Sequence, residues 1–270
     1  MKTRNEHGTL TGRKLIRNEV MDGSAFTVRY IALDEELQRI EYMENWLSSV
    51  FPNYMFSRAP GVSVDALVSV PEYDGLKCRR YYGYDRTPSE IGCYLAHRKC
   101  WKSCAELGLP MLVLEGDVSP RFPEDLPRQL YNLVSLANTF DIIRLHGVFP
   151  ENERIFRKIA AVSPGGTMVQ SLGDIMGSAA YFLTPSAAAE LLRSSETIYH
   201  PVDVFLGATW IHKQRLRTLK PHPFFTLDVP STIGVRRRPI QNISARLKIE
   251  LFRVRDDIRR LTYLPWHFFR

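Results

Sequence analysis

Short apolar segments alternate with amphipathic segments along this chain, and this alternation limits the possible folds more than any other feature. Apolar and β-branched residues concentrate in short runs of the kind that form buried strands. These runs lie at 28–33, 111–114, 141–145, 179–183 and 216–219. Strands that alternate with helices predict an α/β fold with a mainly parallel (mixed) sheet flanked by helices.

The expected helices are defined by their caps and by apolar spacing. Helical segments are expected between Asp34 and Pro52, from Pro88 to about Leu107, at 185–193 and at 201–210. Asp34, Thr87 and Thr184 are the expected N-caps of the first three. Thr87, Pro88 and Glu90 together match a capping box with proline in the first turn. Pro60-Gly61 and Asp74-Gly75 indicate turns between the first two helices.

The positive charge of the chain is concentrated at one end. Residues 236–270 contain ten Lys or Arg against three Asp or Glu, so this segment alone carries the formal net charge of +7. Residues 1–235 are therefore formally neutral. Binding of nucleic-acid phosphates needs a concentrated basic face on the folded domain, so we expect no nucleic-acid partner for the main body.

Cysteine usage and hydropathy favour a cytosolic protein. Cys78, Cys93, Cys100 and Cys104 are too few and too clustered for a secreted disulfide framework. The chain has no apolar run of the roughly 20 residues that cross a bilayer, and residues 1–20 lack the apolar core of a secretory signal. We therefore expect a cytoplasmic location.

Three regions are predicted along the chain. Residues 1–24 are polar and aperiodic, and we expect a flexible arm; residues 25–235 form the predicted catalytic domain. In the tail 236–270, apolar residues step by three or four between basic ones, and an aromatic cluster follows at 263–270. This pattern predicts a basic amphipathic helix at the inner face of the cytoplasmic membrane. The alternative is that the apolar stripe packs on the domain or on a second subunit of an oligomer.

An acidic pair follows the strand expected at 111–114. In an open α/β sheet, ligands bind beyond the carboxyl ends of the strands. Glu115 and Asp117 occupy alternate positions, so both carboxylates can point to one side, and Gly116 lets a ligand approach the backbone. Paired hard oxygens suit Mg²⁺ or Mn²⁺, which commonly share their coordination with substrate phosphates. The pair predicts a divalent cation and a phosphorylated substrate.

Several motifs resemble those of one enzyme family. Residues 89–97 read S-E-I-G-C-Y-L-A-H and residues 114–117 read L-E-G-D. They resemble the G-E-I-G-C-x-x-S-H and L-E-D-D blocks of glycosyltransferase family 25, the family of lipooligosaccharide and collagen galactosyltransferases. Further similar blocks occur in the same order at 30–33 with Arg39, 59–62, 177–192 and 201–203. The resemblance covers about 26–235. Ser89, Ala96 and Gly116 depart from the family pattern, and Gly116 removes one acid.

The resemblance implies a nucleotide-diphosphosugar fold of the GT-A type. It also implies transfer of a hexose, galactose being favoured, from a UDP-sugar to a lipid-linked or oligosaccharide acceptor of lipopolysaccharide or lipooligosaccharide, with inversion. Cation binding is assigned to Glu115, Asp117 and His222. Donor binding is assigned to Leu33, Arg39, Ala59, Glu90, His97 and Glu115. The catalytic base is assigned to Asp203, with Asp174 as the substitute.

Most of these residues also have an alternative interpretation. Glu90 completes a capping box, Asp203 can compensate a helix dipole, and Arg39 and His222 can be surface residues. His97 can be a buried imidazole. His97, Cys93, Cys100 and Cys104 share one helical face, but four ligands along a single helix cannot surround one zinc ion, so we interpret the cysteines as core residues. A non-catalytic glycan- or protein-binding relative is the alternative for the whole chain.

Overall fold

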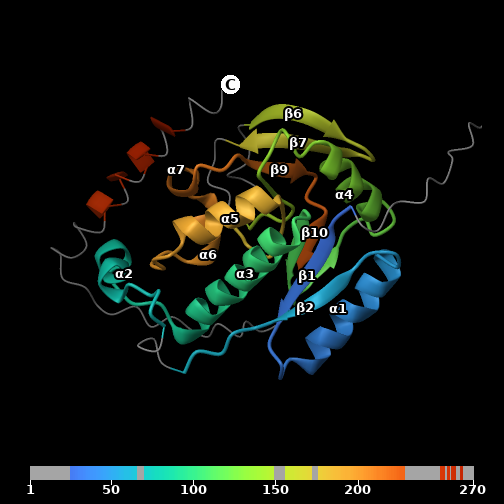
Figure 1. Cartoon of the computed structure of the whole chain (residues 1–270). Coiled ribbons are helices and arrows are strands. Elements are labelled where there is room, and N and C mark those ends of the chain that lie inside the picture. Colours follow the sequence, from blue (N-terminus) through green and yellow to red (C-terminus); the bar gives the residue numbers. More distant parts are fainter. Residues whose placement is uncertain are drawn as a thin grey trace, which may run out of the picture.

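The computed structural model describes residues 25–65, 70–148, 156–171 and 176–228, together with 250–252, 254–255, 257–259 and 262–263. The predicted arm 1–24, the candidate base Asp174 and the aromatic end 264–270 lie outside the described residues. The described part of the molecule is a mixed α/β structure (Figure 1). In chain order the elements are β1 (Thr27–Ala32), α1 (Leu37–Val50), β2 (Phe56–Pro60), α2 (Gly75–Tyr82), α3 (Pro88–Leu107), β3 (Met111–Glu115), β4 (Val118–Pro120), α4 (Leu126–Ser135), β5 (Ile142–Arg144), β6 (Phe156–Val162), β7 (Gly166–Ser171), β8 (Ala180–Leu183), α5 (Pro185–Ser194), α6 (Val202–Gly207), α7 (Thr209–His212), β9 (Leu216–Lys220) and β10 (Phe224–Thr226).

One eight-stranded sheet organises the fold. Its strand order is β2-β1-β3-β8-β5-β9-β7-β6, and β10 and β4 form a separate two-stranded sheet. Strand β1 is parallel to β2 and β3, and β5 is parallel to β9. The β3–β8, β5–β8, β7–β9 and β6–β7 pairs are antiparallel. The expected α/β architecture with a mixed sheet is confirmed, although the parallel pairs predicted to dominate number three of the seven in this sheet.

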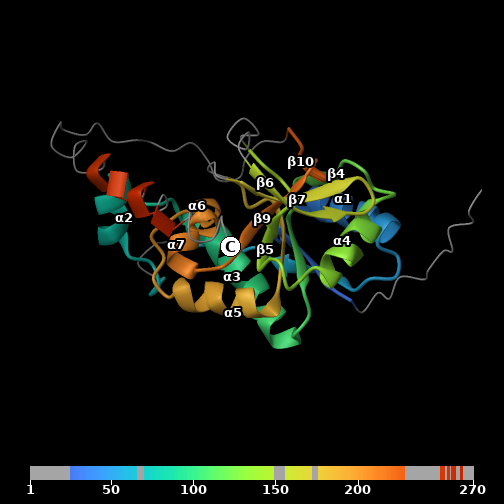
Figure 2. The same cartoon turned by 90° about the horizontal axis from the view of Figure 1, so that it is seen from above.

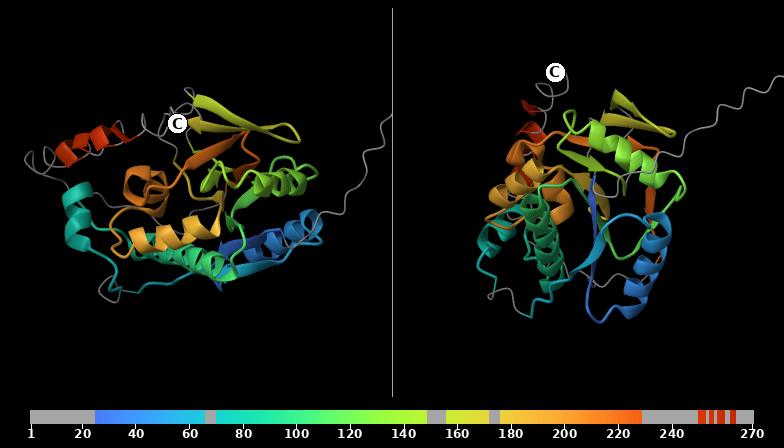
Figure 3. Two further views of the ribbon diagram at one scale, coloured as in Figure 1. Left: turned by 45° about the horizontal axis from the view of Figure 1, so that its top comes forward. Right: turned by 45° about the vertical axis from the view of Figure 1, so that its right-hand side comes forward.

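Helices cover both faces of this sheet (Figures 1 and 2). The reason is visible in β3, where successive side chains alternate between two cores. Leu112 and Leu114 join α1 and α4 in one core, whereas Met111 and Val113 join α3, α5 and α6 in the other. Figure 3 shows the sheet between these two helical layers. A strand that is buried on both faces must be apolar throughout, which is why the continuous apolar runs predicted strands correctly.

Two predicted N-caps are confirmed and one is wrong. The Thr87 hydroxyl accepts the Glu90 amide while the Glu90 carboxylate accepts the Thr87 amide, so the capping box is complete. Thr184 accepts the amide of Ala187 at the start of α5. Helix α1, however, has Glu36 at its N-cap, because the Asp34 carboxylate lies 2.7 Å from Arg58 in an ion pair.

Two further expectations about helices are corrected. The helix expected at 201–210 is two helices, α6 and α7, because Ala208 leaves the helical region with φ −80° and ψ 62°. Asp74-Gly75 begins helix α2 and is not a turn, because the Asp74 side chain accepts the Lys77 amide and so caps the helix. Among the described helices, none is long and apolar enough to cross a membrane.

Candidate active site

The site lies where β1 and β3 end side by side. Their parallel pairing places Ile31 opposite Glu115, so both strands deliver their last residues to the same edge of the sheet. A cleft of about 460 Å³ opens at this edge, between the start of α1, the turn after β2 and the first turns of α3. The predicted residues that line it are Leu33, Arg39, Glu115 and Asp117, and Cys93 and Gly116 also contribute.

Glu115 is held by two hydrogen-bonding groups from different elements. Its Oε1 accepts the Ser178 hydroxyl at 2.6 Å and lies 3.3 Å from Nε2 of His97. Burial opposes ionisation of Glu115, but the hydrogen bond and charge of His97, together with the Ser178 hydrogen bond, outweigh it and lower the pKa of the carboxyl. Glu115 is therefore an ionised carboxylate, fixed through one oxygen.

His97 is fully buried in α3 and contacts Glu115 from behind the cleft surface. Its Nδ1 lies 2.9 Å from the Tyr181 hydroxyl, which also accepts the Trp101 indole N–H at 2.8 Å. These buried contacts fix the plane of the imidazole. The structure thus places His97 where it orients Glu115, and the predicted contact of His97 with the donor remains a prediction.

Asp117 has one carboxylate oxygen, Oδ1, that is buried without a hydrogen-bond partner among the described residues. Burial, and then the negative charge of Glu115, raise the pKa of Asp117, while the positive charge of Arg39 partly offsets both. A divalent cation at Asp117 would satisfy this oxygen and remove the repulsion between the two carboxylates. The residues present therefore fit Mn²⁺ or Mg²⁺.

Gly116 is closely packed between the two acids. A Cβ at this position would lie 3.0 Å from the Ile31 carbonyl oxygen, and Ile31 is held in β1 by its pairing with β2 and β3. The middle acid of the L-E-D-D pattern therefore requires a shift of backbone here. Of residues 115–117, only the flanking Glu115 and Asp117 bring a carboxylate to the cleft.

Arg39 supplies a positive charge to the lining of the cleft, next to Gly116: a Cβ on Gly116 would lie 3.8 Å from the Arg39 Cβ. Its Nη1 donates to Glu36 Oε1 at 2.7 Å, and Glu36 Oε2 accepts the Leu33 amide at 2.9 Å. This network ties the guanidinium to the turn that follows β1. The positive charge of Arg39 lowers the pKa of Asp117 and so acts on the acidic pair.

The other predicted site residues are not among those that line the cleft. Ala59 is buried in the β2 strand, and Glu90 is buried in the capping box with an ion pair to Arg86 at 3.3 Å. Asp203 lies in the first turn of α6, where its Oδ1 accepts the Val204 amide at 2.8 Å. His222 lies near His146, and after burial it is the main cause of the lowered pKa of His146.

Three residues at this site were not identified from the sequence: His146, Ser178 and Tyr181. Cys93 was interpreted as a core residue, but it is half-buried and lines the cleft. His146 follows shortly after a strand, a position that the rule on strand ends could have identified. Ser178 and Tyr181 could not be found in this way. They reach Glu115 and His97 because β8 pairs antiparallel to β3, with Leu114 opposite Ala180, and a sequence does not disclose that pairing.

Arg144 links the segment before β8 to the first turn of α6 from within the core. It is fully buried, and its guanidinium donates to the Gly177 carbonyl at 2.7 Å and to the Asp203 carbonyl at 2.9 Å. We expect Arg144→Met to lower the free energy of unfolding by about 2 kcal/mol, because two buried carbonyls lose their donor. Urea denaturation measures the change. The exposed Arg193→Met is the control, and an equal loss in both variants would contradict the assignment.

The fold and the cleft are typical of α/β enzymes that hold a ligand beyond the carboxyl ends of their strands. The sequence model of glycosyltransferase family 25 (LPS biosynthesis protein) matches residues 27–206, and the chain belongs to this family. The family resemblance seen in the motifs is thus confirmed. The chain is a glycosyltransferase of lipopolysaccharide biosynthesis, which uses a sugar donor and a glycan acceptor. No curated protein matches the chain.

Proposed function

We propose that the chain transfers a hexose, galactose in the first place, from a UDP-sugar to a saccharide acceptor of lipopolysaccharide or lipooligosaccharide, with inversion. The observation that carries the proposal is the Oδ1 of Asp117, which has no hydrogen-bond partner among the described residues, beside the ionised Glu115 in a cleft that Arg39 also lines. Two carboxylates and a guanidinium suit a cation-bound diphosphate. The helix-flanked mixed sheet supports a fold of the GT-A type.

In this proposal Glu115 and Asp117 would hold Mn²⁺ or Mg²⁺, with His222 as the candidate third ligand. The cation supplies neutralisation of the charge that develops on the departing diphosphate. Arg39 binds the diphosphate from the α1 side, and the Leu33 segment forms the adjoining wall. Ala59 and Glu90 support the donor side indirectly, through β2 and the start of α3.

Inversion requires a base that takes the acceptor hydroxyl proton on the side opposite the leaving group. Asp203 is the first candidate because its negative charge acts on Cys93 at the cleft wall, where it contributes to the raised pKa of the thiol after burial and Glu115. The Arg144 contact to its carbonyl fixes the start of α6. Asp174 is the substitute.

UDP release from UDP-galactose, measured with a saccharide acceptor, tests the proposal. We expect turnover with Mn²⁺ and a loss of about 100-fold or more after chelation with EDTA, because the cation stabilises the leaving diphosphate. UDP-glucose and UDP-N-acetylglucosamine are assayed in the same way for comparison with UDP-galactose. Full activity in EDTA would contradict the role of the metal, and no turnover with any UDP-hexose would contradict the reaction.

A second candidate is a non-catalytic relative that binds glycan or protein. Gly116 favours it, because the family pattern has an acid there and this backbone leaves no room for a side chain without a shift. Such a protein would bind the acceptor saccharide in a calorimeter while releasing no UDP. The same assay therefore separates the two functions.

We also propose that the basic tail holds the enzyme at the inner face of the cytoplasmic membrane, where lipid-linked acceptors are present. The described residues of the tail between 250 and 263 are helical. Phe252 stacks on Tyr81 of α2 at 5.0 Å, and Arg255 donates to the same tyrosine. Leu251, Val254 and Ile258 are instead exposed by 62%, 52% and 55%. An exposed apolar stripe on a basic segment supports contact with anionic lipid.

A further inference from the structure

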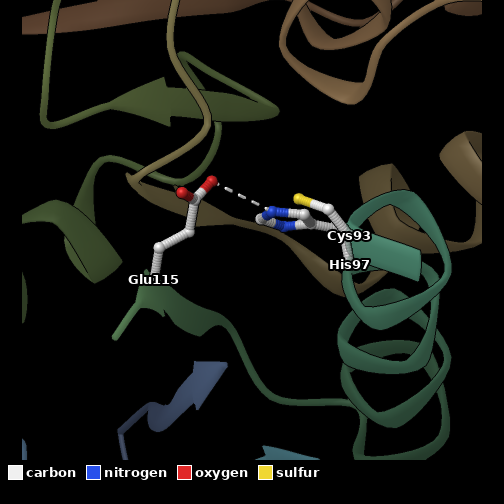
Figure 4. A group of neighbouring side chains, drawn as sticks. All are labelled: Cys93, His97 and Glu115. Carbon is white, nitrogen blue, oxygen red and sulfur yellow. Dashed lines mark hydrogen bonds and ion pairs between the residues drawn. The ribbon is translucent and has the colours of Figure 1, made fainter. Parts of the chain in front are cut away.

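Three side chains of different chemistry converge beside the cleft. Cys93 and His97 are four residues apart on α3 and so share one face of that helix, while Glu115 approaches from the end of β3 (Figure 4). One thiol sulfur, one imidazole nitrogen and one carboxylate oxygen of this group all lie within 4.8 Å of one another. Asp117 and His222 lie outside the group.

We propose that Cys93, His97 and Glu115 form a binding site for Zn²⁺. Thiolate, imidazole and carboxylate are the three ligand types that zinc takes in proteins, whereas Mg²⁺ and Mn²⁺ prefer oxygen. The objection to a site built on one helix does not apply here. Cys100 and Cys104 are buried in the core, and the third ligand comes from a strand that faces the helix.

The surroundings of the group are those of a metal site. His97 presents Nε2 to Glu115, while its Nδ1 contacts the Tyr181 hydroxyl, and such a contact on the second nitrogen orients metal-ligating histidines. The negative charges of Glu115, Asp203 and Asp117 all act on the Cys93 sulfur. A divalent cation here would be stabilised by every one of them.

The group also leaves room for a fourth ligand. Cys93 and Glu115 line the cleft, and the Glu115 side chain is 27% exposed. Three protein ligands and one open position are typical of zinc sites that take up water or substrate. The open position faces the cleft in which we place the sugar donor.

A consequence for activity rests on the proposed function. Zinc bound at Glu115 would withdraw that carboxylate from the cation shared with Asp117, and the fourth coordination position would extend into the donor cleft. Zinc is therefore expected to inhibit sugar transfer. The binding site itself does not depend on this consequence, so the two are tested by separate readouts.

Titration of the metal-free chain with Co²⁺, a spectroscopic substitute for zinc, tests the site without any sugar nucleotide. We expect tetrahedral d–d bands and a thiolate-to-cobalt charge-transfer band, both of which disappear on addition of Zn²⁺. Cys93→Ala should remove the charge-transfer band and weaken Zn²⁺ binding about 100-fold, because a first ligand is lost. Cys104→Ala is the matched control, because Cys104 lies on the same helix but in the core. This variant should keep the charge-transfer band and the Zn²⁺ affinity.

Circular dichroism of the two variants verifies that they are folded. Zinc binding of equal strength in folded Cys93→Ala and wild type would overturn the proposal, as would a cobalt complex without a charge-transfer band. If transfer activity is detected, its sensitivity to zinc should decrease in Cys93→Ala and remain in Cys104→Ala. If no activity is found, the cobalt spectrum still decides the site, so failure of the proposed reaction and failure of the zinc site are distinguishable.

Discussion

Asp117→Asn is expected to lower kcat/KM for sugar transfer by about 100-fold or more, without lowering the stability of the fold. The amide keeps the shape of the side chain but removes the charge that a cation requires, and electrostatic groups of this kind contribute about 2.7 kcal/mol or more to the transition state. Transfer assays at saturating Mn²⁺ measure the loss. Direct titration with Mn²⁺ measures the accompanying loss of affinity.

The stability of Asp117→Asn distinguishes a functional role of Asp117 from a structural one. The Oδ1 atom of Asp117 makes no hydrogen bond with the described residues, and burial raises the pKa of the carboxyl. In the absence of metal the ionised form is therefore an unfavourable group in the fold, and Asn should leave Tm unchanged or raise it. A lower Tm together with a proportional loss of activity would mean that Asp117 holds the fold.

The matched control is Glu124→Gln, which removes one exposed carboxylate that is not among the residues lining the cleft. It should leave both kcat/KM and Tm unchanged. Acidification provides a second check on Asp117. Because the pKa of Asp117 is raised, protons should compete with Mn²⁺ at a higher pH than at an ordinary aspartate. Asp117→Asn should lack this competition between protons and Mn²⁺ in whatever Mn²⁺ binding it retains.

The elements that were predictable are those determined by local chemistry. Strand β3 is buried on both faces from Met111 to Leu114 and is therefore apolar at these four positions, and α3 begins with a complete capping box. The hairpin of β6 and β7 was missed because β6 lies at the edge of the sheet, is half-buried or exposed along most of its length and contains Lys158 and Arg157. Its position is determined by β7, not by its own hydropathy.

The same difference between local chemistry and contacts distant in sequence holds within the site. Glu115 and Asp117 were predictable because they directly follow a recognisable strand, and strand ends locate ligand sites in open α/β sheets. The group of Cys93, His97 and Glu115 was not predictable, since it depends on the distance between a face of α3 and the end of β3. Residue spacing shows only which residues share a face of the same helix as Cys93. The third ligand lies 22 positions further along the chain.

Two buried histidines should make the fold sensitive to mild acid. Burial lowers the pKa of His212 to about 4 and that of His200 to about 3. His212 needs its neutral form, because Nδ1 accepts the Gln214 amide at 3.1 Å while Nε2 faces the Leu206 carbonyl at 3.3 Å. Nδ1 of His200 lies 2.5 Å from the Tyr82 hydroxyl.

The direction in which stability changes with pH follows from the number of protons that the folded and the unfolded chain bind. Unfolded histidine has a pKa near 6.5, so between pH 6.5 and about 4 the unfolded chain binds more protons than the folded one, and stability falls as pH falls. Each histidine should cost about 2 kcal/mol between pH 7 and pH 5, at about 1.4 kcal/mol for each pKa unit. The two together should lower the free energy of unfolding by about 4 kcal/mol, and His146, whose pKa is also lowered, acts in the same direction.

Urea denaturation at pH 7, 6 and 5 measures this loss, in a range above the titration of ordinary carboxylates. His212→Gln destabilises the core at every pH. The informative quantity in this variant is therefore the change in the free energy of unfolding between pH 7 and pH 5. An amide does not titrate, so the loss between pH 7 and pH 5 should decrease by about 2 kcal/mol in this variant. A wild-type stability that is constant over this range would mean that the folded chain admits a charged imidazole at these positions, and the packing around α7 would then have to be looser than described.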